Sequence, residues 1–426
     1  MHPRTLERPR AAADPAVWIA ALFGLNFLLQ RVSILPNMSI SASTPLVLAW
    51  MFLAWRRGVV SIDTHRAALW FVSAGFSAVV ILVQQALVEQ AQISLTSWAY
   101  WVITWLPIIV TIPMATVEVY RRVARAVAYV GVGIAALSGL FVGSQFAGVP
   151  YRDYVADVLP DALEVQGFVV AYPIMWGSEI HKSNAWFALE PSFLSFTLGV
   201  TALCALVGRT RSWVFFASVA GVLSTFAGSG LLVLLVGVVG LALMGQIRKV
   251  RGPLLVGAFA AVLAWFTPVR ESVYGRVTEL GSNGSSSALR TIEPYLYLVP
   301  EWLKNPLGMA FGYGPSSSRV IIEGLSINGL QTPNIPKMVF DYGLLVGSVM
   351  VLVLVVAHWR SPYPALGLSL LVSFVTVQTA APAMVNCSFM LVTWWASTKS
   401  VNKVHEEAAS VQGSGSSSEA LPVPAR

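Results

Sequence analysis

Two groups of residues in this sequence have side chains suited to chemistry at a membrane surface. The first is Glu190-Pro191-Ser192, which opens an apolar block and follows a polar segment that contains Lys182 and Trp186. Proline suits the first turn of a helix, so the Glu190 carboxylate is expected at a helix start, where water, a substrate or a cation can reach it. The alternative is a capping carboxylate that interacts with the positive end of the helix dipole.

The second group is a set of arginines in the segment 269–337, interleaved with aromatic residues and a glycine-rich run. Arginine stays charged at any physiological pH and binds phosphate oxygens through paired hydrogen bonds. Close to apolar helices, such a set suits a lipid-linked phosphate or pyrophosphate, whereas an ordinary solvated loop is the alternative. The arginines are Arg270, Arg276, Arg290 and Arg319, and the aromatic residues include Tyr313 and Trp302.

The rest of the chain consists of apolar blocks that would position these groups at a membrane. The 426 residues are 56% hydrophobic and 11% charged, whereas soluble domains carry roughly 25% charged residues. Blocks of about 16–24 residues approach the length that crosses a bilayer as a helix. We therefore expect an all-α, polytopic integral membrane protein with about 12 transmembrane helices. The expected spans are 16–36, 40–55, 68–88, 98–117, 126–147, 189–207, 212–228, 230–246, 253–268, 338–357, 363–380 and 384–397.

Basic residues indicate the orientation of these spans. They gather in alternate connections, for example at Arg56-Arg57 and Arg121-Arg122, and the positive-inside rule places such connections in the cytoplasm. The sequence predicts an N-in/C-in topology. Its parts are a cytoplasmic N-terminal segment 1–15, a transmembrane domain 16–397 and a flexible cytoplasmic tail 398–426. The long connections 148–188 and 269–337 would then lie outside.

Charges within the chain exclude some classes of function and site. The net charge is +7, but the basic residues punctuate apolar blocks rather than forming a stripe, which argues against a nucleic-acid partner. Cys204, Cys387 and the histidines form no ligand pattern, so no metal is expected. Arg31, inside the first expected span, is expected to reach the outer surface. Asp341 lies just inside the span after the second long connection and is expected to face the same cavity.

Several short motifs, taken in order, resemble bacterial O-antigen polymerases of the Wzy type. The wider superfamily includes O-antigen ligases of the WaaL type. The motifs are Glu190-Pro191-Ser192-Phe193, the run from Thr225 to Gly230, the run from Ser287 to Arg290, Asn305-Pro306-Leu307-Gly308, Phe311-Gly312-Tyr313-Gly314, Asn334, and Asp341-Tyr342-Gly343-Leu344.

This resemblance implies a helical fold like that of GT-C glycosyltransferases, in a bacterial inner membrane, with a large catalytic loop and active site facing the periplasm. It implies an inverting transfer from undecaprenyl-pyrophosphate-linked glycans, with no metal or cofactor required. The expected activity joins lipid-linked oligosaccharide repeat units into the O-antigen of lipopolysaccharide or into exopolysaccharide. The expected partners are the lipid-linked glycans, the lipid bilayer and a chain-length regulator.

Each candidate residue has an expected role in this reaction. Arg290 would stabilise the charge that develops on the leaving pyrophosphate. Glu190, with Asp341 and Glu293 behind it, would act on the acceptor hydroxyl. The expected substrate-binding residues are Arg270, Arg276, Arg319, Lys182 and Asn334, together with Tyr313, Trp186 and Trp302, whose rings could stack on sugars.

Two alternatives stay open. An O-antigen ligase would transfer the glycan to lipid A core or to a protein; that branch usually has a His-Asn pair where this sequence has Pro333-Asn334. A membrane transporter or flippase would perform no chemistry. It predicts inverted repeats and paired charges near the bilayer midplane, rather than long outer segments.

Overall fold

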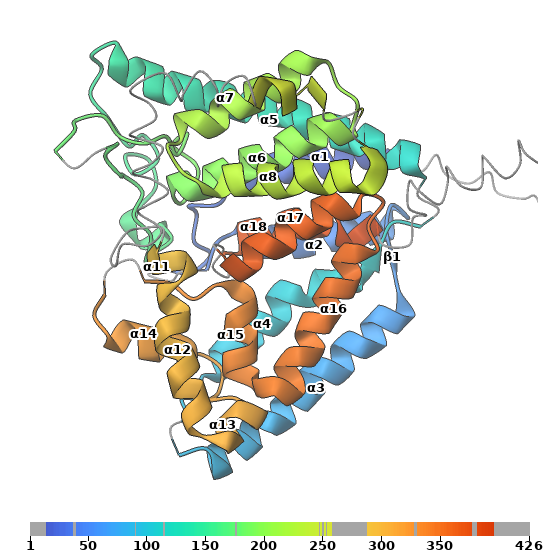
Figure 1. The fold of residues 1–426 in the computed structure, drawn as a ribbon, viewed down its shortest axis with the longest axis vertical. Helices are drawn as coiled ribbons and strands as arrows, with labels where there is room; N and C mark the ends of the chain where they lie inside the picture. Colours follow the sequence, from blue (N-terminus) through green and yellow to red (C-terminus); the bar gives the residue numbers. More distant parts are fainter. Residues whose placement is uncertain are drawn as a thin grey trace, which may run out of the picture.

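The computed structural model describes residues 14–36, 40–89, 91–113, 116–174, 177–246, 248, 251–252, 254–257, 288–327, 330–376 and 381–395. The predicted tail 398–426 and all but the last two residues of the predicted segment 1–15 lie outside these ranges. Most of the described chain is helical, as predicted, and Figure 1 shows the helices packed into one bundle.

The helices follow the order of the predicted apolar blocks. They are α1 (Pro15–Leu28), α2 (Ser43–Arg56), α3 (Thr64–Leu87), α4 (Leu95–Trp105), α5 (Val117–Phe146), α6 (Pro191–Val207), α7 (Ser212–Ser224), α8 (Ser229–Leu241), α11 (Ala288–Thr291), α12 (Glu293–Lys304), α13 (Pro306–Phe311), α14 (Ser317–Gly324), α15 (Asn334–Tyr342), α16 (Ser348–Trp359), α17 (Pro364–Thr376) and α18 (Pro382–Leu391). Shorter helical pieces are η1 (Leu106–Ile109), η2 (Asp161–Leu163), η3 (Ala242–Gln246), η4 (Gly343–Gly347) and η5 (Thr393–Trp395).

Every predicted span except 253–268, most of which lies outside the described residues, overlaps at least one of these helices. Among the described residues, four helical stretches are long and apolar enough to cross a membrane. They are Thr64–Leu87, Val117–Phe146, Ser229–Gln246 and Asn334–Trp359. Others are shorter than expected: α18 has 10 residues, about 15 Å of helix, against a hydrocarbon core of about 30 Å.

α6 lies in the middle of the bundle and carries Glu190 at its start. It packs against α5, α7 and α8, and nearly all of its side chains are buried. A helix that is apolar around its whole circumference belongs in a core. Its polar side chains stay satisfied locally; for example, the Thr197 hydroxyl donates to the Phe193 carbonyl over 2.9 Å.

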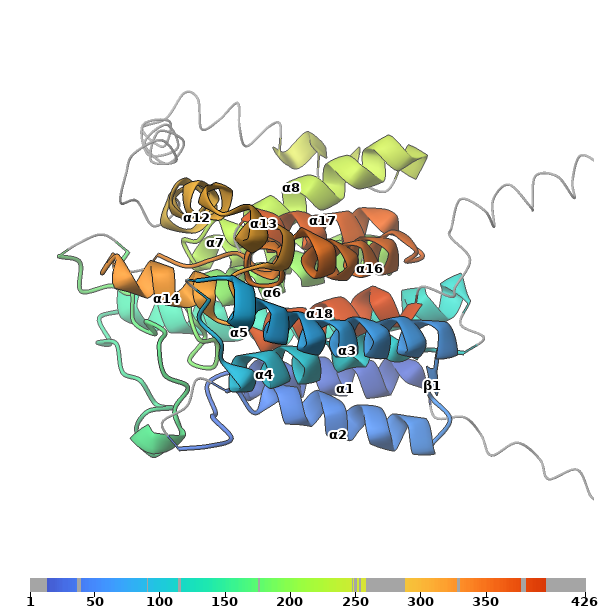
Figure 2. The same ribbon diagram turned by 90° about the horizontal axis from the view of Figure 1, so that it is seen from below.

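The two ends of the bundle differ. At one end, β1 (Ser61–Ile62) pairs antiparallel with β2 (Val110–Thr111). Arg66 fastens this end to the last described residues by donating to the Thr393 carbonyl over 2.7 Å. We call the opposite end the loop end; it comprises residues 148–190 and 288–333. Figure 2 shows most helices running between these ends, with β1 at one side and the 148–188 segment and α14 at the other.

Arg31 lies differently from its prediction. α1 ends at Leu28, so Arg31 lies beyond the helix, and its side chain is 1% exposed rather than at the surface. Its guanidinium donates to both carboxylate oxygens of Asp153, each over 2.7 Å, and pairs with Glu164. A buried guanidinium needs such partners. Arg31 therefore holds the 148–188 segment against the end of α1.

Candidate functional site

Glu190 and Arg290 meet at the loop end of the bundle. Arg290 Nη2 lies 2.7 Å from Glu190 Oε2, and the Glu190 side chain is 3% exposed while that of Arg290 is 13% exposed. Arg290 Nη1 also donates to Ser192 Oγ over 3.0 Å, and this hydroxyl donates to the same Glu190 oxygen over 3.1 Å. Three side chains, two charged and one polar, therefore form one closed hydrogen-bonded group, which we call the Glu190–Arg290 cluster.

The sequence positions Glu190 at the residue before α6, as predicted. Pro191 occupies the first helical turn, and Glu190 has an extended backbone, as a residue that precedes a helix usually has. Its side chain accepts no capping hydrogen bond from the α6 backbone. The carboxylate turns to Ser192 and Arg290 instead, so a capping hydrogen bond is absent, although Glu190 does lie at the positive end of α6.

Tyr172 belongs to the same site, and the sequence analysis missed it. The Lys182 amide donates to the Tyr172 carbonyl over 2.7 Å, so the backbones of these two residues lie side by side. The Tyr172 phenol lies near the charges of both Glu190 and Arg290. Burial and the nearby Glu190 charge raise the pKa of the Tyr172 phenol, partly opposed by Arg290. Tyr172 thus stays a neutral hydroxyl that can donate or accept.

The start of α8 packs directly on the start of α6. Ser229 Oγ donates to the Ser192 carbonyl over 2.5 Å, and the Gly230 amide donates to Ser195 Oγ over 3.1 Å. A Cβ added at Gly230 would lie 2.1 Å from the Ser195 carbonyl oxygen. The motif from Thr225 to Gly230 therefore brings a second helix start, with its positive dipole end, next to the cluster.

Arg290 reaches the cluster from α11, and the segment just before α15 packs beside α11. The Gln331 amide donates to the Leu289 carbonyl over 3.4 Å, so the residues just before α15 lie beside α11. Asn334, the first residue of α15, is 2% exposed. Its Nδ2 has no hydrogen-bond partner among the described residues. A buried amide without a partner is costly, and here it lies on the segment that flanks Arg290.

Asp341 lies apart from the cluster and stabilises the start of α14 instead. Its carboxylate accepts hydrogen bonds from the backbone amides of Ser318 over 2.9 Å and Ser316 over 3.2 Å, and pairs with Lys337 at 3.1 Å. The first amides of a helix lack partners within the helix. Asp341 supplies them for α14, and no hydrogen bond or ion pair joins it to Glu190 or Arg290 within the described chain.

The other predicted binding residues are dispersed. Arg319 is 64% exposed and pairs with Glu323 one helical turn on. Tyr313 is buried, stacks on Phe340 at 5.0 Å between ring centroids, and donates to the Glu301 carbonyl. Trp302 packs beside that buried group, and Trp186 lines a cleft near the end of α5. Arg270 and Arg276 lie outside the described residues.

The cluster has the parts for transfer chemistry on an anionic group: a guanidinium, a carboxylate, two hydroxyls and two helix starts. Among the described residues, no group of three or more His, Cys, Asp or Glu side chains could hold a metal ion. A comparison with protein families finds no matching family model, and a comparison with curated proteins finds no match.

Proposed function

We propose that this chain is an inverting glycosyltransferase of a bacterial inner membrane that polymerises undecaprenyl-pyrophosphate-linked oligosaccharide repeat units. The observation that carries the proposal is the contact between Arg290 and Glu190 at 2.7 Å, with Ser192 joined to both. It places an anion-binding group and a proton-accepting group within reach of one another. A polymerase of this kind needs both, one for the leaving group and one for the acceptor.

The apolar helices and the basic connections support a membrane location for this reaction. Four stretches are long and apolar enough to cross a bilayer; the apolar blocks of the sequence predict about 12 spans, and the basic connections favour both ends of the chain in the cytoplasm. In this topology the loop end faces the periplasm, the side where a lipid-linked repeat unit would be joined.

α12 supports a substrate that is attached to a lipid. It runs crosswise to α7 and α8 at the loop end (Figure 1), and directly follows α11 with Arg290. Its exposed face carries Leu296 and Leu303, which are 60% and 61% exposed. A helix with such a face suits the membrane interface. Arg290 would then lie at the level of lipid headgroup phosphates.

Arg290 acts on the leaving group in the proposed reaction. A guanidinium has five N–H donors, so it can bind phosphate oxygens in addition to Ser192 and Glu190. As the bond between the anomeric carbon and the pyrophosphate oxygen breaks, the electron pair leaves with the undecaprenyl pyrophosphate. Fixed positive charge from Arg290, together with the helix starts of α6 and α8, stabilises this growing negative charge.

Glu190 acts on the acceptor. The sugar hydroxyl of the second repeat unit attacks the anomeric carbon from the face opposite the pyrophosphate, so a new glycosidic bond forms with inversion. Its proton passes to the Glu190 carboxylate, while Ser192 and Tyr172 orient the two sugars by hydrogen bonds. The donor is already activated, so the step balances without a nucleotide or a further reactant.

The experiment is removal of the chain from its bacterium, followed by gel analysis of surface glycans and of the lipid carrier pool. A polymerase predicts that the ladder of chain lengths collapses to a single repeat unit. If finished polymers instead accumulate on the carrier, the chain is a ligase; if repeat units remain on the cytoplasmic face, it is a flippase. Either result contradicts the proposal.

A further inference from the structure

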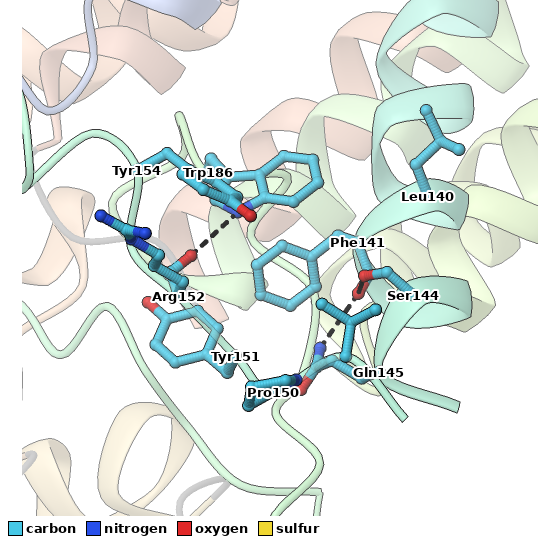
Figure 3. A pocket seen from close by; sticks show the side chains of 10 residues that line it. Leu140, Phe141, Ser144, Gln145, Pro150, Tyr151, Arg152, Tyr154 and Trp186 are labelled. Atoms are coloured by element: carbon cyan, nitrogen blue, oxygen red, sulfur yellow. Dashed lines mark hydrogen bonds between the residues drawn. The ribbon is translucent and has the colours of Figure 1, made fainter. Parts of the chain in front are cut away.

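A cleft lined by aromatic residues lies near the loop end of α5, apart from the Glu190–Arg290 cluster. Its volume is about 210 Å³, and its walls include Phe141, Gln145, Tyr151, Arg152, Tyr154 and Trp186. Figure 3 shows the rings gathered around one space, with Arg152 at an edge. The Tyr154 side chain is 51% exposed, so at least one ring faces outward.

Arg31 holds two walls of this cleft in place from behind. One of its nitrogens donates both to Asp153 and to the Trp186 carbonyl, over 2.7 and 2.9 Å. Asp153 lies between Tyr151 and Tyr154 in the chain. The buried Arg31 guanidinium thus links the loop that carries Tyr151 and Tyr154 to the turn that carries Trp186. The rings are therefore positioned before any ligand binds.

Trp186 holds an unfavourable backbone conformation. Its φ is 62° and that of Ala185 is 49°, a left-handed region that bulky residues rarely adopt. The Asn184 side chain stabilises it by accepting from the Trp186 amide over 2.9 Å. Such strain persists mainly where a side chain must be aimed in one direction. Here the indole is aimed at Phe141 and Tyr154, at 5.0 and 5.9 Å between ring centroids.

We infer that this cleft is a carbohydrate-binding subsite that takes one or two sugar rings of a glycan chain. Sugar rings present apolar C–H faces to aromatic rings and hydroxyls to polar groups at the edge. The cleft offers both, since its floor is aromatic and Arg152 and the tyrosine phenols lie around it. Its volume is below the ~300–1,000 Å³ of pockets that enclose a whole ligand, which suits contact with part of a chain.

The position of the cleft relative to Glu190 indicates that the subsite holds the acceptor glycan. Glu190 is four positions after Trp186, and a chain segment of that length spans at most about 14 Å. The inference rests on the proposed function: a glycan bound in the cleft would extend toward the cluster and present its terminal hydroxyl there. The acceptor would thus be held by its sugars, away from the reacting atoms.

The test uses the full chain in lipid nanodiscs and the oligosaccharide released by mild acid from the lipid-linked pool of its bacterium. Calorimetry measures binding to the wild type, Tyr154→Ala and Tyr154→Phe. Tyr129→Ala is the matched control, because Tyr129 is 45% exposed but lies outside the cleft. We expect Tyr154→Ala to weaken binding about fivefold, as the loss of one stacking ring predicts. Tyr154→Phe and Tyr129→Ala should bind like the wild type.

A wild type that does not bind the oligosaccharide, or a Tyr154→Ala variant that binds it normally, overturns the subsite. So does a Tyr154→Ala variant that loses affinity for undecaprenyl phosphate in vesicles but not for the sugar, since the cleft would then hold lipid. Oligosaccharide binding and glycan transfer are both measured for the wild type and for Arg290→Ala, so the two proposals can fail separately. If Arg290→Ala binds the oligosaccharide but the wild type transfers no glycan, the subsite stands and the proposed function fails.

Discussion

Arg290 donates a hydrogen bond to Glu190 over 2.7 Å, although 100 positions separate the two residues in the sequence. The fold brings them together by placing Glu190 at the start of the central helix α6 and carrying Arg290 across the loop end on α11. Both side chains are mostly buried. Removing one partner of a buried ion pair leaves the other uncompensated, so each substitution needs a check on folding as well as on activity.

Arg290→Ala should lower glycan transfer about 10²- to 10³-fold, the usual effect of losing one group that stabilises charge in a transition state. Arg290→Lys should recover little of this, because lysine keeps the charge but loses the planar fork that binds two oxygens at once. Gel analysis of polymer length, with membrane level measured by immunoblot, checks both variants.

Arg319→Ala is the matched control for Arg290→Ala. It removes an arginine from the same loop, but one that is 64% exposed and paired with Glu323 on the surface of α14. Exposed pairs of this kind contribute roughly 0–1 kcal/mol. We expect a normal ladder of polymer lengths; a loss equal to that of Arg290→Ala would show that Arg290 has no special role among the arginines of this loop.

Glu190→Gln should reduce the turnover of transfer much more than the amount of protein in the membrane. Glutamine keeps the size of the side chain and can still accept from Ser192, but it cannot take the acceptor proton. Initial rates at saturating substrate, compared with those of Glu323→Gln, measure the effect. If Glu190→Gln lowers only the amount of folded protein, Glu190 has a structural role alone.

Gly230→Ala should destabilise the protein by about 1–3 kcal/mol, the usual cost of overpacking. Its Cβ would lie 2.1 Å from the Ser195 carbonyl oxygen, so the starts of α6 and α8 would have to separate. Gly228→Ala is the control, because nothing lies within 4 Å of a Cβ at that neighbouring glycine. Thermal unfolding in detergent should show a lower Tm for Gly230→Ala only.

Acid should release the 148–188 segment from the end of α1. Burial alone would raise the pKa of Asp153, but hydrogen bonds and charge attraction from Arg31 outweigh it, and the net shift is downward. A carboxyl whose pKa is lowered on folding contributes stability above its unfolded pKa of about 3.9 and loses it as pH falls through the folded value. Limited proteolysis of this segment should therefore accelerate below about pH 4.

Asp153→Asn provides the comparison, since the asparagine cannot ionise. Its segment should be cleaved readily at neutral pH and gain little further sensitivity on acidification. Equal cleavage of wild type and variant at neutral pH would show that the Arg31 contact does not hold the segment.

Local pattern was enough to predict most of the long helices. Apolar blocks follow from residues that are close in sequence, so α3 and α6 fall where expected, whereas α5 begins nine residues before the predicted span 126–147, and α11 to α14 lie in the predicted connection 269–337. The predicted span 98–117 is wrong in part. Its helix, α4, ends at Trp105, because the residue before a proline, here Pro107, disfavours the α-helical conformation. The chain then turns into β2, whose partner β1 lies about 50 positions earlier, and no local pattern announces such a pairing.

The residues that form the site could be predicted from their types, but their contact partners could not. Glu190 was expected at a helix start and lies there, yet its contact with Arg290 depends on the whole loop end. Arg31 lies among apolar residues, while its partners Asp153 and Glu164 lie 122 and 133 positions away. Tyr172 gave one weak signal, a hydroxyl within an apolar stretch. Asp341 was grouped with Glu190 by proximity to the same loop, but it serves α14.

The most direct test of the central claim is transfer by purified protein in liposomes that contain undecaprenyl-pyrophosphate-linked repeat units. Longer lipid-linked glycans and released undecaprenyl pyrophosphate are measured together, for the wild type and for Arg290→Ala. The account predicts one released undecaprenyl pyrophosphate for each new linkage with the wild type, and both products lowered about 10²- to 10³-fold with Arg290→Ala. Unchanged repeat units with the wild type, or equal turnover by the two proteins, would contradict it.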